Sequence, residues 1–137
     1  MAEEYKQVAG PEQDDDVRVL FVEDDPSVAQ MYKLKLELDG YKVEVAPDGE
    51  LALKMATDSP PDMIFLDIRL PKMDGLAVLE ALRKDERTAH IPVVILSNYS
   101  ERELVERGLK LGALEYLIKS QTTPAKLAGG VENWLKG

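Results

Sequence analysis

The chain contains four short apolar runs, and each leads into a polar residue that can take part in chemistry. Stretches with helical spacing of apolar residues separate the runs, which is typical of parallel strands buried on both faces. In an open parallel sheet, ligands bind beyond the carboxyl ends of the strands. The polar residues are therefore expected at one edge of the sheet. The runs are residues 17–22, leading into Glu23, Asp24 and Asp25; residues 63–66, leading into Asp67; residues 93–96, leading into Ser97; and residues 114–118, leading into Lys119.

The complete pattern predicts an α/β fold. A fifth run at 41–46 alternates apolar and polar residues and is typical of an edge strand. A helix-like stretch follows each of the five strands. We therefore expect a three-layer α/β/α sandwich, with a five-stranded parallel sheet between helices and right-handed crossovers.

Several signals describe the helices. Pro26 favours the first turn of a helix, and apolar residues at 28, 31, 34 and 38 predict one buried stripe on it. Ser100 and Glu103 have the spacing of a capping box at the start of a later helix. Gly129 and Gly130 fall inside the last helix, where each costs about 1 kcal/mol relative to alanine. The last helix is therefore expected to be the least stable on propensity.

Length and charge limit the classes of function. The 137 residues suffice for one domain, and the net charge is −9. Six acidic residues and one lysine lie in the first sixteen positions, so residues 1–16 are expected to be a disordered acidic tail before a domain at 17–137. The chain has no cysteine and no apolar stretch near the roughly 20 residues that span a bilayer. We expect a cytoplasmic protein without membrane insertion and without direct binding of nucleic acid.

Three carboxylates are expected to share one site. Neighbouring strands lie about 4.8 Å apart, so Glu23, Asp24 and Asp67 can enter one coordination sphere. Crowded carboxylates repel one another, and a hard cation with oxygen ligands relieves the repulsion; Mg²⁺ suits a site with few protein ligands. The alternative is an acidic turn before a helix N-terminus, which the helix dipole favours. Asp67 at the end of a second buried strand favours the metal site.

Ser97 and Lys119 bring a hydroxyl and an ammonium group to the same edge. Each has a structural alternative, since Ser97 can cap a turn and Lys119 can form an ion pair at the rim of the sheet. A lysine neutralises anionic oxygens as a point charge. Together with the acids and a metal ion, the two residues predict a site for a phosphoryl group on a carboxylate.

Residues 17–135 resemble the receiver domains of response regulators in two-component phosphorelays, in particular single-domain chemotaxis regulators. Four motifs in the right order carry the resemblance: the acidic cluster at 22–26, the block at 67–75, Ser97-Asn98, and residues 116–119. The resemblance implies a flavodoxin-like fold with strand order 2-1-3-4-5.

The resemblance also implies the acceptor and the metal ligands. Asp67 would be the phospho-acceptor. Asp24, Asp67 and the backbone carbonyl of Arg69 would bind Mg²⁺, or Mn²⁺ in its place, and Glu23 would bind through a water molecule. Asp25 would cap the following helix.

By the same resemblance, Ser97 and Lys119 would bind the phosphate, and Tyr116 would be the aromatic switch residue. One departure concerns the residue after the lysine, where the family usually has a proline in a cis peptide and this chain has Ser120. A cis bond before a residue other than proline costs about 3 kcal/mol, so a trans bond and a reshaped loop are expected.

Arg69 and Tyr99 each lie two residues beyond a site residue, namely Asp67 and Ser97. Both side chains are bulky. We hypothesise that they shield the acyl phosphate from water and slow its hydrolysis.

The function expected from the resemblance is that of a stand-alone phospho-accepting switch with at most slow self-dephosphorylation. A sensor histidine kinase or a histidine phosphotransfer protein would donate the phosphoryl group, and a separate effector would bind the switched face. The face formed by 100–111, 114–118 and 122–135 is also where such domains form homodimers. Two alternatives are a phosphate-independent adaptor and a phosphatase of the haloacid-dehalogenase type. The latter normally needs an aspartate where this chain has Arg69.

Overall fold

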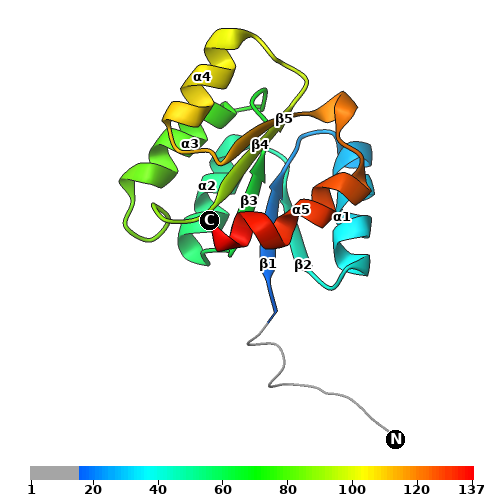
Figure 1. Ribbon diagram of the computed structural model, residues 1–137. Coiled ribbons are helices and arrows are strands. Elements are labelled where there is room, and N and C mark those ends of the chain that lie inside the picture. Colours follow the sequence, from blue (N-terminus) through cyan, green and yellow to red (C-terminus); the bar gives the residue numbers. More distant parts are fainter. Residues whose placement is uncertain (1–15) are drawn as a thin grey trace, which may run out of the picture.

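The computed structural model describes residues 16–137. Its centre is a sheet of five parallel strands in the order β2-β1-β3-β4-β5, which confirms the predicted fold class and strand order (Figure 1). Because all strands are parallel, their carboxyl ends lie along one edge. The strands are β1 (Arg18–Val22), β2 (Lys42–Ala46), β3 (Met63–Leu66), β4 (Val93–Ser97) and β5 (Glu115–Ile118).

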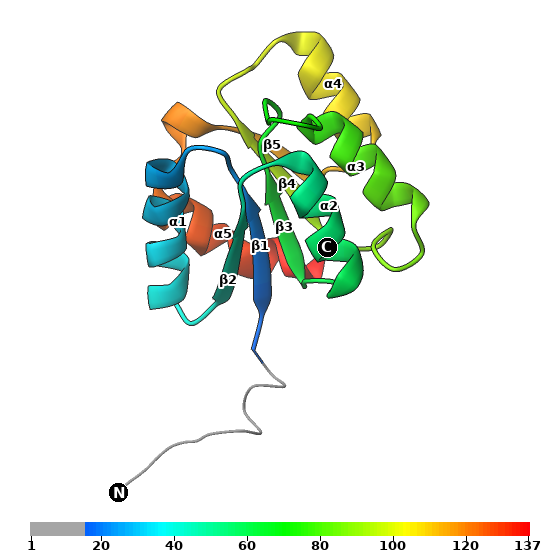
Figure 2. The ribbon, with the colours of Figure 1, turned by 180° about the vertical axis from the view of Figure 1, so that it is seen from behind.

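Five helices cover the two faces of the sheet. Helices α1 (Pro26–Leu38) and α5 (Pro124–Lys136) lie on one face, as Figure 1 shows. Helices α2 (Gly49–Asp58), α3 (Gly75–Lys84) and α4 (Arg102–Lys110) lie on the other face, seen in Figure 2. A short 3₁₀ turn, η2 (Lys119–Gln121), joins β5 to α5. Within residues 16–137, no helix has the length and apolarity needed to cross a membrane.

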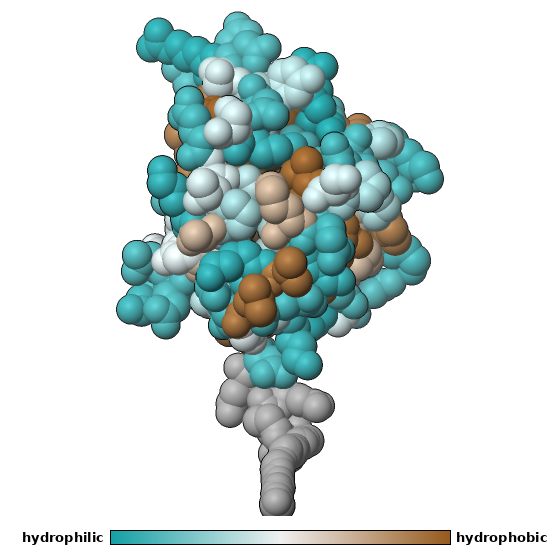
Figure 3. Space-filling model, turned by 90° about the vertical axis from the view of Figure 1, so that its right-hand side faces the viewer, coloured by the Kyte–Doolittle hydropathy of each residue, from teal (hydrophilic) through white to brown (hydrophobic). Residues whose placement is uncertain are grey.

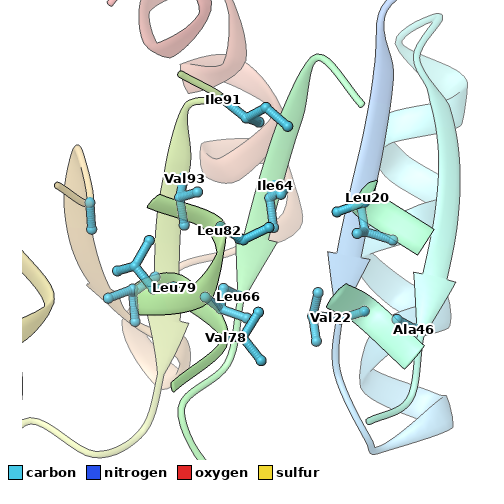
Figure 4. Close-up of a cluster of buried hydrophobic side chains, with 14 of the residues drawn as sticks. Leu20, Val22, Ala46, Ile64, Leu66, Val78, Leu79, Leu82, Ile91 and Val93 are labelled. Carbon is cyan, nitrogen blue, oxygen red and sulfur yellow. The ribbon is translucent and has the colours of Figure 1, made fainter. Parts of the chain in front are cut away.

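Each face of the sheet carries its own apolar cluster, because successive side chains of a strand point to opposite faces. On β1, Leu20 and Val22 pack toward α2 and α3 (Figure 4), whereas Val19 and Phe21 pack toward α1 and α5. The central strands β3 and β4 are buried throughout. They form the rigid support on which the residues at the strand ends are held.

Of the stripe predicted on helix α1, only Val28 packs against the core, and the helix is otherwise buried along a different face. Its buried residues are Ala29, Tyr32 and Leu36. Met31, Leu34 and Leu38, which the spacing assigned to the core, are 48%, 55% and 74% exposed. Apolar residues lie on two faces of this helix, and the face that contains Tyr32 is the one that packs on Phe21 of the sheet.

The helix N-termini are capped by side chains in four cases. Asp25 caps α1 and Asp48 caps α2, while Asp74 and Thr123 accept backbone N–H hydrogen bonds at the starts of α3 and α5. The capping box predicted at Ser100 is wrong. Helix α4 begins after Glu101, and no side chain there accepts a hydrogen bond from the helix backbone.

The predicted acidic tail, residues 1–16, lies outside the described residues except for Asp16. The carboxylate of Asp16 lies 3.7 Å from the ammonium of Lys42 at the edge strand β2.

Candidate functional site

The acidic residues lie at the carboxyl ends of two adjacent strands. Glu23 and Asp24 follow β1, and Asp67 follows β3, which pairs directly with β1. The backbone N–H of Asp67 donates to the carbonyl of Val22 at 3.2 Å and so ties the two strand ends together. One carboxylate oxygen from each of Glu23, Asp24 and Asp67 lies within 4.8 Å of the other two. The proximity predicted from the strand ends is therefore present in the structure.

Lys119 reaches across β4 to this cluster from the end of β5. Its Nζ atom lies 2.7 Å from Glu23 Oε1 and donates a hydrogen bond of 2.8 Å to Asp67 Oδ2. The contact with Glu23 is an ion pair, and the buried Glu23 Oε1 atom has no hydrogen-bond partner among residues 16–137. Glu23 is 2% exposed and Asp67 is 5% exposed, so these charges interact largely away from water.

Burial and pairing act in opposite directions on the charged groups. Burial raises the pKa of Glu23 above its usual value, against the attraction of the Lys119 ammonium. Burial by itself would lower the pKa of Lys119, but its contacts with Asp67 and Glu23 outweigh that effect and the net shift is upward. Lys119 is therefore a cation at neutral pH and supplies the positive charge of the site.

The loop between β3 and α3 holds Asp67 in a fixed orientation. Asp67 Oδ1 accepts a hydrogen bond of 2.7 Å from the backbone N–H of Ile68. The N–H of Gly75 donates to the carbonyl of Ile68 at 2.8 Å, which brings the start of α3 against the strand end. A Cβ atom at position 75 would lie 2.0 Å from the backbone oxygen of Asp67. Only glycine therefore permits this approach.

The donor set fits a hard divalent cation. Glu23, Asp24 and Asp67 supply oxygen ligands only, and Asp24 is exposed while the other two are buried. Crowded, partly buried carboxylates with one open side suit an ion that keeps several water molecules, as Mg²⁺ does. Among residues 16–137, Lys119 is the one ammonium group at the cluster. It forms ion pairs with Glu23 and Asp67 but not with Asp24.

Ser97, Tyr99 and Tyr116 form a connected group beside the acids. Ser97 is the last residue of β4 and is fully buried. Its Oγ accepts a hydrogen bond of 3.1 Å from the N–H of Tyr99, and the hydroxyl of Tyr116 donates to the carbonyl of Tyr99. Burial raises the pKa of Tyr116, so its hydroxyl remains a donor at neutral pH. Ser97 and Tyr116 are thus linked through one residue.

The side chains of Arg69 and Tyr99, which follow the ends of β3 and β4, contact each other. The guanidinium carbon of Arg69 lies 4.3 Å from the centre of the Tyr99 ring, within the range of a cation–π interaction. The two bulky residues that the sequence placed after Asp67 and Ser97 are therefore in contact with each other.

Two distant side chains bond the backbone of the loop after Lys119, and these contacts were not predicted from the sequence. The Ser120 N–H donates to Asn98 Oδ1 at 3.0 Å, and the hydroxyl of Tyr32 donates to the carbonyl of Thr122. All peptide bonds of residues 16–137 are trans, as expected for Lys119-Ser120. Tyr32 and Thr122 are 90 positions apart, so no local pattern connects them.

Comparison with known proteins identifies the family. Residues 19–129 match the sequence pattern of the response regulator receiver domain. The chain belongs to this family. Receiver domains are signalling switches rather than enzymes, which excludes the phosphatase alternative, and the acidic cluster at β1 and β3 is the pocket typical of phosphoryl acceptance in such domains.

Curated relatives agree with this assignment. The DNA-binding dual master transcriptional regulator RpaA of Synechocystis is 41% identical over 102 residues, which are 74% of this chain and 42% of that protein. Response regulator PleD of Caulobacter vibrioides is 39% identical over 102 residues, 74% of this chain and 22% of that protein. This receiver domain thus spans less than half the length of these relatives.

Solved structures show the same receiver fold. The receiver domain of the Francisella response regulator 1452 superposes with a TM-score of 0.80 at 35% identity, covering 88% of this chain and 98% of that one. The chemotaxis response regulator CheY4 of Vibrio cholerae also gives a TM-score of 0.80, at 30% identity, with 87% and 98% covered.

Proposed function

We propose that this receiver domain accepts a phosphoryl group on Asp67 from a phosphohistidine and alters a partner-binding face in response. The donor is a sensor histidine kinase or a histidine phosphotransfer protein. A carboxylate oxygen of Asp67 attacks the phosphorus atom, the N–P bond breaks, and the imidazole leaves with the bonding electron pair. The observation that carries the proposal is the position of Lys119 Nζ, 2.8 Å from Asp67 Oδ2, because it places a cation beside the nucleophile.

A divalent cation completes the proposed site. Asp24, Asp67 and the backbone carbonyl of Arg69 would hold Mg²⁺, and Glu23 would bind it through water. When bound, the cation neutralises charge on the oxygens of the transferring phosphoryl group. Lys119 supplies a second positive charge at Asp67.

The connection through Tyr99 suggests how the signal leaves the site. The Ser97 hydroxyl is proposed to bind a phosphoryl oxygen on Asp67, which changes the contact between Ser97 Oγ and the N–H of Tyr99. Tyr116 is bonded to the carbonyl of the same residue and responds to its movement. The face formed by α4, β5 and α5 then shifts between two pre-existing states and binds a separate effector protein.

Phosphorylation by a small donor tests the acceptor. With acetyl phosphate and Mg²⁺, the intact mass should increase by one phosphoryl group, and the increase should be absent in Asp67→Asn. The Asp58→Asn variant, which makes the same change at an exposed carboxylate of α2, serves as the control and should gain the mass as wild type does. A wild-type protein that gains no mass under these conditions would support the phosphate-independent adaptor instead.

The exposed face of α1 offers the donor a surface next to the acceptor. Helix α1 begins two residues after Asp24, and its exposed apolar residues continue away from the site along one side of the helix. Figure 3, which views the molecule from the side where α1 lies in Figure 1, shows apolar atoms on this face surrounded by hydrophilic ones. An apolar patch with a polar rim is typical of a protein interface. The patch consists of Met31, Leu34 and Leu38.

The patch can be tested separately from the chemistry. Leu34→Ser should slow phosphotransfer from a phosphorylated histidine kinase that is active on the wild-type protein, and should leave phosphorylation by acetyl phosphate unchanged. Leu109→Ser, at a leucine of α4 with 46% exposure, is the matched control. Equal rates of kinase phosphotransfer for the Leu34 and Leu109 variants would show that α1 does not bind the donor.

A further inference from the structure

The segment that carries Lys119 is held by contacts from two distant elements. Lys119 lies in the turn η2, which follows β5 and begins the connection to α5. Within the turn, the Thr122 N–H donates to the carbonyl of Lys119 at 3.2 Å, and Thr122 Oγ1 donates to the carbonyl of Ile118 at 2.8 Å. These local bonds define the shape of the turn. They do not fix its position relative to Asp67, which lies on another strand.

Tyr32 of α1 provides the first distant contact. Its ring is fully buried and stacks on Phe21 of β1, with 5.3 Å between the ring centres. Its hydroxyl donates to the carbonyl of Thr122 and lies 3.4 Å from the carbonyl oxygen of Lys119. Burial raises the pKa of Tyr32, so the hydroxyl keeps its proton and remains a donor. The turn is thereby attached to the same strand that carries Glu23 and Asp24.

Asn98 provides the second contact. Its Oδ1 atom accepts a hydrogen bond of 3.0 Å from the backbone N–H of Ser120, the residue directly after Lys119. This bond requires an N–H at position 120, which a proline would lack. Asn98 is also the neighbour of Ser97, so the bond joins the hydroxyl-bearing loop to the lysine-bearing turn.

We propose that Tyr32 and Asn98 are positioning residues that together hold the turn so that Lys119 Nζ lies against Asp67. The two hydrogen bonds hold the turn at two points, at Ser120 in its middle and at Thr122 directly after it. Both side chains bond the backbone of this segment and so act through Lys119. The inference rests on the proposed phosphorylation of Asp67 and goes beyond it by naming what aligns the lysine.

Single-atom or small changes test the two contacts. Tyr32→Phe removes the hydroxyl and keeps the stacked ring. Asn98→Ala removes the acceptor, and Asn98→Asp restores it. Each loss should lower the initial rate of phosphorylation by acetyl phosphate about fivefold, the ratio that corresponds to one ordinary protein hydrogen bond. Asn98→Asp should regain most of the rate. Tyr41→Phe is the matched control, because the Tyr41 hydroxyl makes no hydrogen bond with any residue of the described range 16–137.

Two further measurements separate positioning from general destabilisation. The ¹³Cε chemical shift of Lys119 should move toward that of a free lysine in Tyr32→Phe and Asn98→Ala, but not in Tyr41→Phe. The Mg²⁺ dissociation constant should stay within twofold of wild type in all variants, because the carboxylates are not displaced. A purely structural role would lower the urea midpoint and leave the rate and the Lys119 shift of the folded protein unchanged, which would overturn the inference.

The experiment also distinguishes the inference from the proposed function. If the wild-type protein takes up no phosphoryl group, the proposed function fails, and the Lys119 chemical shifts still decide whether Tyr32 and Asn98 position the lysine. If wild type is phosphorylated and the Tyr32→Phe and Asn98→Ala variants match it in rate and shift, only the inference fails.

Discussion

Alanine substitutions at Gly129 and Gly130 should change the stability of the domain in opposite directions, although the two residues are adjacent in α5. A Cβ atom at position 129 would meet no atom within 4 Å. Gly129→Ala therefore gains only the higher helix propensity of alanine, about 1 kcal/mol. For a domain of this size, that corresponds to an increase in melting temperature of about 3 °C.

At Gly130, the same gain is opposed by a steric conflict with Trp134. A Cβ atom at position 130 would lie 2.6 Å from Cη2 of the indole ring. The ring makes an edge contact with Phe65, at 5.7 Å between centres, and its Nε1–H donates to Glu115 at 2.7 Å. Displacing the ring loses about 1 kcal/mol for the aromatic pair and about 1 kcal/mol for the hydrogen bond. Gly130→Ala should therefore be less stable than wild type by about 1 kcal/mol.

Urea unfolding followed by circular dichroism measures both changes. The Trp134→Leu background provides the control, because without the indole ring both alanine substitutions should be stabilising by similar amounts. The reasoning is refuted if Gly130→Ala is as stabilising as Gly129→Ala while Trp134 is present.

Three further predictions follow from local contacts. Arg69→Ala and Tyr99→Ala should each shorten the half-life of the phosphorylated form at least severalfold, because each removes one partner of the cation–π pair. The half-life is measured by loss of phosphate from the purified adduct. Unchanged half-lives would contradict the shielding hypothesis. The hydrogen bonds from Arg87 lower the pKa of the Asp85 carboxyl from 3.8 to about 2. Because this pKa is lower in the folded state, the ionised carboxylate stabilises the fold above about pH 4, and this stabilisation is lost as the pH falls toward 2. In urea titrations, Asp85→Asn should therefore be less stable than wild type at pH 7. The two proteins should become similar in stability near pH 2. A stability difference that is independent of pH would count against the pairing. Lys72 has a positive φ of 70°. Lys72→Gly should therefore raise the melting temperature slightly, because it relieves backbone strain of about 1 kcal/mol. A lower melting temperature by calorimetry would show that the lysine side chain contributes more to stability than the strain costs.

Local sequence patterns were sufficient for the architecture and for the membership of the acidic cluster. Buried strands are recognisable as continuous apolar runs, and parallel strands necessarily bring their carboxyl ends to one edge. Glu23, Asp24 and Asp67 could therefore be grouped before any coordinates, and the structure brings them within 4.8 Å. The cap at Asp25 depends on positions only a few residues apart and was predictable for the same reason.

The sequence did not determine the packing of a helix or its first residue where two arrangements fit the same local pattern. Helix α1 has apolar residues on more than one face, and periodicity cannot tell which face meets the sheet. In the structure, the face with Tyr32 meets the sheet, where Tyr32 stacks on Phe21, and Leu34 on another face is exposed to solvent. At Ser100, the capping-box spacing was present, but the backbone enters α4 one residue later and the side chains do not reach.

The alignment of Lys119 was likewise decided by the tertiary structure alone. The sequence identified the lysine, because an apolar strand leads directly into it. The bonds from Tyr32 to Thr122 and from Asn98 to Ser120 span 90 and 22 positions, and they form only when α1, β4 and β5 are packed on one sheet. Sequence spacing determines which residues stand at the end of each element, whereas contacts between elements depend on how their faces pack together.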